Sequence, residues 1–453
     1  MKKQINSISA FQFYQLVRYA TLILIGVVFT KTTITQTEIG EYETFVFIAG
    51  AVSFFWLNGL QKALLPLTAT NKNTNSHIFS AFVILQVLSI VAAVFLFFMQ
   101  PLFSKLLLNG KNIPEIWLLL AFIVFGVPAN LIEYFYLIKK KNNAIIIYSI
   151  VSFSVQLIMV AFPAIFGYGI KVAMQGLVLS SVLRYIWLWI ILISSGETNY
   201  SHTFVKEHLK LGGPLIAATF LSGSAQFVDG FIVTSYFDEE TFAVFRYGAR
   251  ELPLAMLLAN ALSNAMLPDF AKNDQLKQNL QKLKESVTRL THFLFPITAL
   301  LLLVSHPVFP IIFNPKFTES ATIFNIYLLI IISRLLLPQT LLNGLQISKP
   351  IMNAAFLELT LNVSLSLILV RFFGIAGVAY ATFIAYLFEK IYLSVVVKKK
   401  LNVGLSEYIP VKIYTIYSAA ILVIFAFAEY VFNTGCWMLN SGYLMDLCGG
   451  FPL

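Results

Sequence analysis

The chain has 453 residues, of which 58% are hydrophobic and only 11% charged, and its formal net charge is +10. Soluble globular proteins carry about 25% charged residues, so this composition excludes a soluble protein and predicts an integral membrane protein. The two cysteines, Cys436 and Cys448, both lie in the last 20 residues. Their position excludes a disulfide framework and a cysteine-based metal site.

Thirteen apolar segments follow one another along the chain. A helix of about 20 mostly apolar residues crosses the hydrocarbon core of a bilayer, and no segment shows the period-two alternation of a membrane strand. The first is interpreted as an uncleaved span, because no cleavage site follows the basic N-terminus. Residues 433–453 contain one further apolar stretch that is too short and too polar to assign. The predicted spans are 11–30, 42–68, 78–102, 115–138, 144–166, 172–194, 210–236, 241–268, 290–313, 322–345, 351–371, 376–397 and 411–432.

Basic residues concentrate in alternate loops. The loops on the side of the N-terminus contain the runs Lys139–Lys141 and Lys398–Lys400, whereas the opposite loops contain few lysines and arginines. Because cytoplasmic loops carry an excess of these residues, we expect a cytoplasmic N-terminus. The positive net charge then reflects this bias and does not indicate nucleic-acid binding.

A nine-residue motif occurs twice. NGLQKALLP (58–66) and NALSNAMLP (260–268) lie 202 residues apart, and five of their nine positions are identical. A second match relates residues 169–186 to 374–391, with one gap and an offset near 206. Because each repeat contains six spans, both halves enter the membrane in the same orientation. We therefore predict a first lobe at 1–195, a linker at 196–213, a second lobe at 214–397, and an extra helix with an unassigned tail at 398–453.

Two segments, 37–66 and 238–272, resemble the region of span 2 and its counterpart in polysaccharide flippases. These proteins form the polysaccharide transport branch, which includes O-antigen flippases, of the multidrug/oligosaccharidyl-lipid/polysaccharide exporter superfamily. The resemblance implies an all-α polytopic membrane protein in which two parallel six-helix repeats form a V-shaped cleft, with one or two extra C-terminal helices.

The resemblance also implies a function. It implies a flippase in the bacterial cytoplasmic membrane that moves an undecaprenyl-diphosphate-linked oligosaccharide for O-antigen, capsule or exopolysaccharide synthesis. It implies no catalytic residue, metal or cofactor, and it is compatible with H⁺ or Na⁺ coupling. The expected partners are the lipid-linked glycan and membrane lipids, and polysaccharide polymerases are candidate partners.

Ionisable side chains inside membrane spans are costly and usually face a cavity or a partner. On a continuous helix over 241–268, the side chains of Arg246, Arg250, Asn260 and Asn264 would form one polar stripe. Guanidinium groups suit a diphosphate, and the depths along spans 7 and 8 predict that Asp229 pairs with Arg246 or Arg250. The alternative is a structural ion pair. The candidate cleft residues are Arg18, Arg246, Arg250, Asp229, Gln226, Asn58, Asn260 and Asn264.

Other charges in the spans are given structural interpretations. Glu358 is the expected partner of Arg334, and four residues near the inner span ends are expected to anchor the helices at the interface, namely Glu133, Arg184, Glu389 and Lys390. Two rival functions are weighed. A cation-coupled multidrug exporter would need an acidic cleft, and a glycan-assembly enzyme would need a long catalytic loop and an acid/base or nucleophile constellation, which the sequence lacks.

Overall fold

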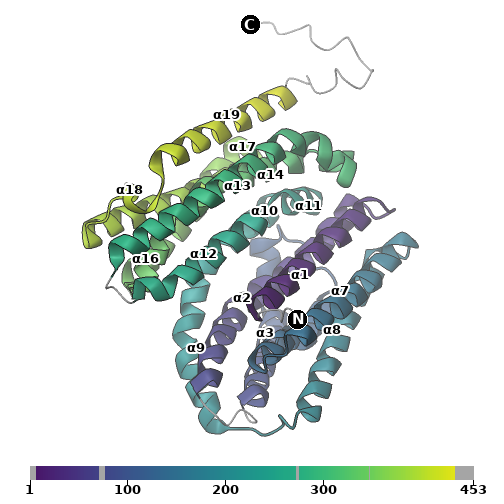
Figure 1. The fold of residues 1–453 in the computed structure, drawn as a ribbon. Helices are drawn as coiled ribbons and strands as arrows, with labels where there is room; N and C mark the ends of the chain where they lie inside the picture. The colour runs from purple at the N-terminus through teal and green to yellow at the C-terminus, as the bar shows by residue number, and fades with distance from the viewer. Residues whose placement is uncertain (1–6, 71–76, 252, 272–274, 346, 434–453) are drawn as a thin grey trace, which may run out of the picture. The chain divides into compact units, whose positions relative to one another are not determined.

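In the computed structural model, the described part of the chain comprises residues 7–70, 77–251, 253–271, 275–345 and 347–433. Every regular element in these ranges is a helix (Figure 1), which confirms the predicted all-α fold class. Both cysteines lie outside the described residues. Contacts between Cα atoms divide the chain into two compact units, Met1–Ala243 and Val244–Leu453.

The first unit contains the first seven predicted spans. Within it α1 packs on α7, α7 packs on α8, and α2 runs along α9. The α2–α9 contact is close because Gly59 and Gly212 lie in it, and a Cβ atom at Gly59 would stand 2.7 Å from the backbone of Ile216. Its helices are α1 (Ser7–Thr30), α2 (Gln36–Thr70), α3 (His77–Leu107), α4 (Ile116–Ala121), η2 (Phe122–Gly126), α5 (Val127–Ala129), α6 (Ile132–Ile138), α7 (Asn142–Ile165), α8 (Gly169–Ser194), α9 (His202–Gly223) and α10 (Ala225–Tyr236).

The second unit begins inside α11. The last helix, α19, packs on α13 and is tied to the bundle by Glu429, which bonds to His306 (2.9 Å) and Asn325 (2.8 Å). The helices are α11 (Glu239–Gly248), α12 (Pro253–Ala271), α13 (Leu276–Ile312), η3 (Pro315–Phe317), α14 (Glu319–Leu328), α15 (Ile331–Arg334), α16 (Pro338–Gly344), α17 (Ser348–Leu401), α18 (Leu405–Tyr408) and α19 (Val411–Asn433).

Nine helices in the described ranges are long and apolar enough to cross a membrane, or ten if the bent pair Glu319–Arg334 and Pro338–Gly344 forms one span. With the bent pair counted as one span, two causes remain for the difference from thirteen. Helix α17 contains two predicted spans, which meet at Gly374, where φ is 56°. Predicted spans 7 and 8 are each divided into two shorter helices, α9 with α10 and α11 with α12.

The internal repeat is visible in the contacts of each unit. Gln61, in the first copy of the motif, donates to the carbonyl of Asn130 on span 4 at 3.1 Å. Ser263, the matching residue 202 positions later, bonds to Thr340 on span 10 at 2.7 Å. Both partner spans are broken helices. The repeated motif therefore makes the same kind of contact twice, although the lobe boundary at 196–213 stays a prediction.

Candidate functional site

The candidate site in the second unit is built around a break in span 8. Helix α11 ends at Gly248, where a Cβ atom would stand 2.4 Å from the carbonyl oxygen of Ser320, so α11 lies tightly against the start of α14. Helix α12 begins at Pro253, and a proline disfavours helical geometry in the residue before it. The predicted continuous helix over 241–268, with its single polar stripe, is therefore wrong.

Arg250 lies in this break, and an aromatic platform supports its side chain. Its guanidinium carbon lies 5.2 Å from the centre of the Tyr247 ring, a cation–π distance. Its Nε donates to the carbonyl oxygen of Arg246 at 3.4 Å, and Tyr247 stacks on Phe317. Among the described residues, Arg250 forms no salt bridge. Its positive charge therefore remains available to a ligand.

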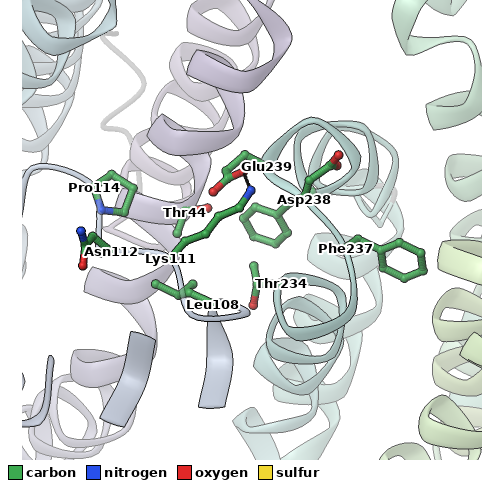
Figure 2. Close-up of a pocket in the computed structure, with 10 residues that line it drawn as sticks. Thr44, Leu108, Lys111, Asn112, Pro114, Thr234, Phe237, Asp238 and Glu239 are labelled. Atoms are coloured by element: carbon green, nitrogen blue, oxygen red, sulfur yellow. Dashed lines mark hydrogen bonds and ion pairs between the residues drawn. The ribbon is translucent and has the colours of Figure 1, made fainter. Parts of the chain in front are cut away.

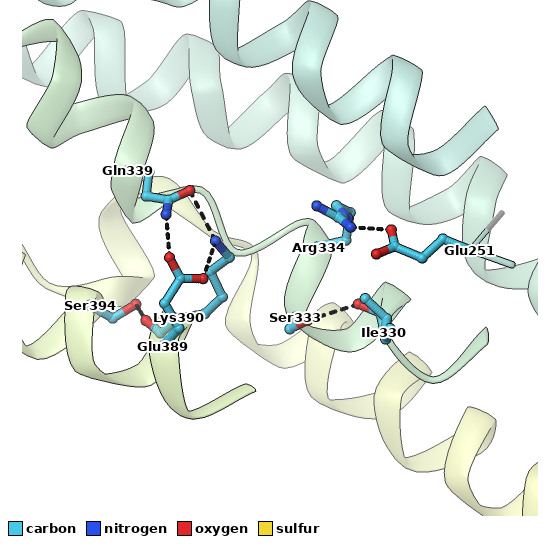
Figure 3. Close-up of polar contacts among 8 residues, drawn as sticks. All are labelled: Glu251, Ile330, Ser333, Arg334, Gln339, Glu389, Lys390 and Ser394. Atoms are coloured by element: carbon cyan, nitrogen blue, oxygen red, sulfur yellow. Dashed lines mark hydrogen bonds and ion pairs between the residues drawn. The ribbon is translucent and has the colours of Figure 1, made fainter. Parts of the chain in front are cut away.

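Arg334 is the last residue of α15, where span 10 breaks before α16. Its Nη2 donates to Glu251, and its guanidinium carbon lies 5.6 Å from the ring centre of Tyr386. Figure 3 shows the Arg334 and Glu251 side chains pointing toward each other. The predicted pairing of Arg334 with Glu358 is wrong, because the break in span 8 brings Glu251 to it.

The four predicted interfacial anchors are buried within the helical units. Glu133, Arg184, Glu389 and Lys390 are 3%, 9%, 4% and 7% exposed, respectively. A snorkelling anchor keeps its charged group in water, so the anchor interpretation is wrong for these residues. In the second unit, Lys390 bonds to Gln339 (3.0 Å) and to Glu389 (2.7 Å), and Gln339 also donates to Glu389 (Figure 3).

The other predicted site residues fall into two groups. Arg18 and Asn58 are exposed in the first unit, and Asn260 and Asn264 are exposed on α12. A polar side chain exposed on a membrane span is expected to face water rather than lipid. Asp229 on α10 is 2% exposed, and its pairing with Arg246 or Arg250 stays a prediction. Gln226 lies in α10, but its side chain is outside the described part of the structure.

Lys62 is a basic residue of the first unit that was not among the predicted site residues. This residue is exposed on α2, one turn after Asn58, and its Nζ donates to Thr219 on α9 at 3.4 Å. The sequence could have indicated Lys62 as a site residue, because it is a charged residue inside a predicted span. It also lies in the first copy of the repeated motif, at the position that Asn264 holds in the second copy.

A second polar site in the first unit joins the start of α2 to the α3–α4 loop and the start of α11. Lys111 pairs with Glu239, and Thr37 donates to Glu240 at 2.7 Å. Figure 2 shows Lys111 pointing toward Glu239 beside a small cavity of about 20 Å³. Hydrogen bonds from Thr241 lower the pKa of the Asp238 carboxyl next to it. By the predicted orientation, this site lies on the outer side of the membrane.

Comparison with known proteins gives a family and a fold. The family described as polysaccharide biosynthesis protein matches residues 33–322. Comparison with curated protein sequences gives no significant match. Among solved structures, the lipid II flippase MurJ in an inward closed conformation is similar, with a TM-score of 0.62 and 18% identity over 94% of this chain and 98% of that one.

Two further solved structures share the fold. One is an inward-facing multidrug resistance transporter of the MATE family and MOP superfamily, with a TM-score of 0.63 and 13% identity over 88% of this chain and 98% of that one. The other is a MOP superfamily transporter from Pyrococcus furiosus, with a TM-score of 0.54 and 12% identity over 88% and 97%. These neighbours share the all-α fold that the sequence predicted.

Proposed function

Because the chain belongs to the polysaccharide biosynthesis protein family, we propose that it is a flippase for a lipid-linked glycan. Its substrate is an undecaprenyl-diphosphate-linked oligosaccharide, moved by alternating access across the bacterial cytoplasmic membrane for O-antigen, capsule or exopolysaccharide synthesis. The N-terminus is cytoplasmic, the two lobes are 1–195 and 214–397, and movement is coupled to H⁺ or Na⁺. A polysaccharide polymerase is the expected consumer of the product.

The charge at the helix breaks of the second unit supports this proposal. Arg246, Arg250 and Arg334 lie at or beside the breaks in spans 8 and 10, and Glu251 is the carboxylate that pairs with Arg334. Helix α11 has 10 residues and is therefore about 15 Å long, at about 1.5 Å per residue. Arg250 follows the end of this helix, so it lies about 15 Å along the span from the helix start. An excess of arginine at that depth favours an anionic group.

A diphosphate is the anionic group that suits this arrangement. Arginine donates two parallel hydrogen bonds to phosphate oxygens, and broken helices commonly line transporter binding sites. Arg334 is already paired with Glu251, while Arg250 is held only by Tyr247 and a backbone carbonyl. We therefore assign Arg250 as the leading diphosphate contact, with Arg246 beside it.

The rival proposal is a cation-coupled multidrug exporter, since solved structures of that class share the fold. Such an exporter binds cations, and a surplus of arginine would repel them. The two proposals are separated by deleting the gene and analysing lipid-linked glycans. The flippase is supported if completed lipid-linked glycans accumulate in the inner leaflet and disappear on complementation. Unchanged glycans with increased drug sensitivity would support the exporter.

Arg250→Ala and Arg250→Lys test the proposed contact in the same complementation assay. Each charge-assisted hydrogen bond contributes about 1.5–3 kcal/mol, so we expect Arg250→Ala to lower export at least about tenfold. Arg250→Lys retains the charge without the planar fork and should fall in between. Arg371→Ala, an exposed arginine of the same unit, is the control. Full export by both Arg250 variants at normal expression would exclude the contact.

A further inference from the structure

A group of buried polar side chains lies in the first unit, where α1, α6, α7 and α8 come together. Glu133 on α6, Arg184 on α8 and Tyr14 on α1 are all at least nine-tenths buried. Glu133 Oε2 and Arg184 Nε are buried without a hydrogen-bond partner, and the Tyr14 hydroxyl lies beside the Glu133 carboxyl group. Two such atoms close together indicate that a partner from outside the chain completes the site.

The side chains around Glu133 define the chemistry of that partner. The titratable and charged groups that act on its carboxyl group are Tyr14, Arg18, Tyr134, Tyr148 and Arg184. No salt bridge joins Glu133 to either arginine in the part of the chain that the structure describes. Two nearby guanidinium groups repel a metal cation. A proton, in contrast, binds the carboxylate covalently and provides an O–H donor.

The equivalent position in the second unit has a different composition. Glu133 and Arg184 correspond to Gln339 and Lys390, each 206 residues later, and the starts of α7 and α17, at Asn142 and Ser348, differ by the same number. There the polar groups satisfy one another. Gln339 does not titrate, and Lys390 pairs with Glu389 on its own helix at 2.7 Å. Of the two related sites, the one in the first unit therefore contains an exchangeable carboxyl group with unused bonding capacity.

We propose that Glu133 is a proton-binding site that is loaded and unloaded during the transport cycle, so that export is coupled to H⁺ rather than Na⁺. In the loading step, a hydronium ion from the aqueous side transfers its proton to the carboxylate, which leaves a carboxylic acid and water. Glu133 lies five residues before the end of α6 at Ile138, which is about 8 Å along the helix. A proton therefore has only a short path between the Glu133 carboxyl group and the water at that end of α6. The coupling part of this inference depends on the proposed transport function.

Infrared difference spectroscopy of the full-length protein, between acidic and alkaline pH, tests the site without any transport assay. We expect a protonated-carboxyl band that is lost in Glu133→Gln, shifted in Glu133→Asp and retained in Glu389→Gln, since Lys390 neutralises Glu389. Identical spectra in the wild type and in Glu133→Gln, with monodisperse protein, would overturn the proposal. Because this measurement needs no substrate, it still decides the proton site if the chain exports no lipid-linked glycan.

Export in complemented cells tests the coupling. An imposed pH gradient should change the export rate several-fold in the wild type and in Glu389→Gln, and leave the rate of Glu133→Gln unaffected by the gradient. A Na⁺ gradient that drives export in the wild type while a pH gradient does not would overturn the assignment to H⁺. An unaltered response to pH in Glu133→Gln would place the coupling proton elsewhere in the chain and refute the proposal.

Discussion

Gly40 controls how closely the start of α2 approaches α11. A Cβ atom at this position would stand 2.0 Å from the carbonyl oxygen of Glu239 and 2.4 Å from its carbonyl carbon. These are backbone atoms, so no rotamer change relieves the contact. Carbon and oxygen approach to about 3.3 Å at closest, so Gly40→Ala requires the two segments to separate by about 1.3 Å. The neighbouring Lys111–Glu239 and Thr37–Glu240 contacts would then be lost.

The size of the effect follows from the cost of overpacking. Inserting one carbon into a packed contact costs about 1–3 kcal/mol. Each 1.4 kcal/mol is about a factor of ten in an equilibrium constant, so the contact should be populated about 5- to 150-fold less. Gly213→Ala on α9 is the matched control, because a Cβ atom there meets nothing within 4 Å.

Chemical cross-linking measures this population directly. Thr37→Cys and Glu240→Cys, in a chain whose two native cysteines are replaced by serine, place thiols on the two sides of the contact. We expect a short thiol cross-linker to join them readily, with the yield falling sharply on adding Gly40→Ala and staying constant on adding Gly213→Ala. Equal yields in all three chains would show that the close approach at Gly40 does not exist in the membrane.

Two further predictions concern charges. Removing one partner of a buried ion pair costs about 3–5 kcal/mol. Because the side chains of Arg334 and Glu251 are 19% and 24% exposed, we expect Arg334→Ala to lower the free energy of unfolding by about 2 kcal/mol. The double variant with Arg334→Leu and Glu251→Leu should unfold at a higher temperature than Arg334→Ala. The reverse order of unfolding temperatures would contradict the pairing. The lowered pKa of Asp238 means that its carboxylate stabilises the fold above about pH 4 and loses this effect as pH falls further. Asp238→Asn should therefore flatten the acid side of the stability profile, and an unchanged profile would show that the Thr241 hydrogen bonds contribute nothing.

The sequence by itself determined the features that depend on the solvent. A chain with 58% hydrophobic residues has to satisfy its backbone inside a bilayer, and helices do so locally. Apolar length alone therefore located most of the predicted spans, and the predicted segments 351–371 and 376–397 lie on either side of Gly374, where the backbone leaves helical geometry. The repeated motif was likewise readable, because the contacts of Gln61 and Ser263 select similar residues in both copies.

Tertiary structure decided which residues meet. Apolar length predicted an unbroken helix through Arg246 and Arg250, whereas α11 ends at Gly248, which packs closely on Ser320. That break brings Glu251, and not Glu358, to Arg334. The burial of Glu133 was equally invisible in the sequence, since a charge near a span end is compatible with an interface or with a bundle interior. Ion partners depend on helix rotation and on where helices break, and only the packed bundle determines both.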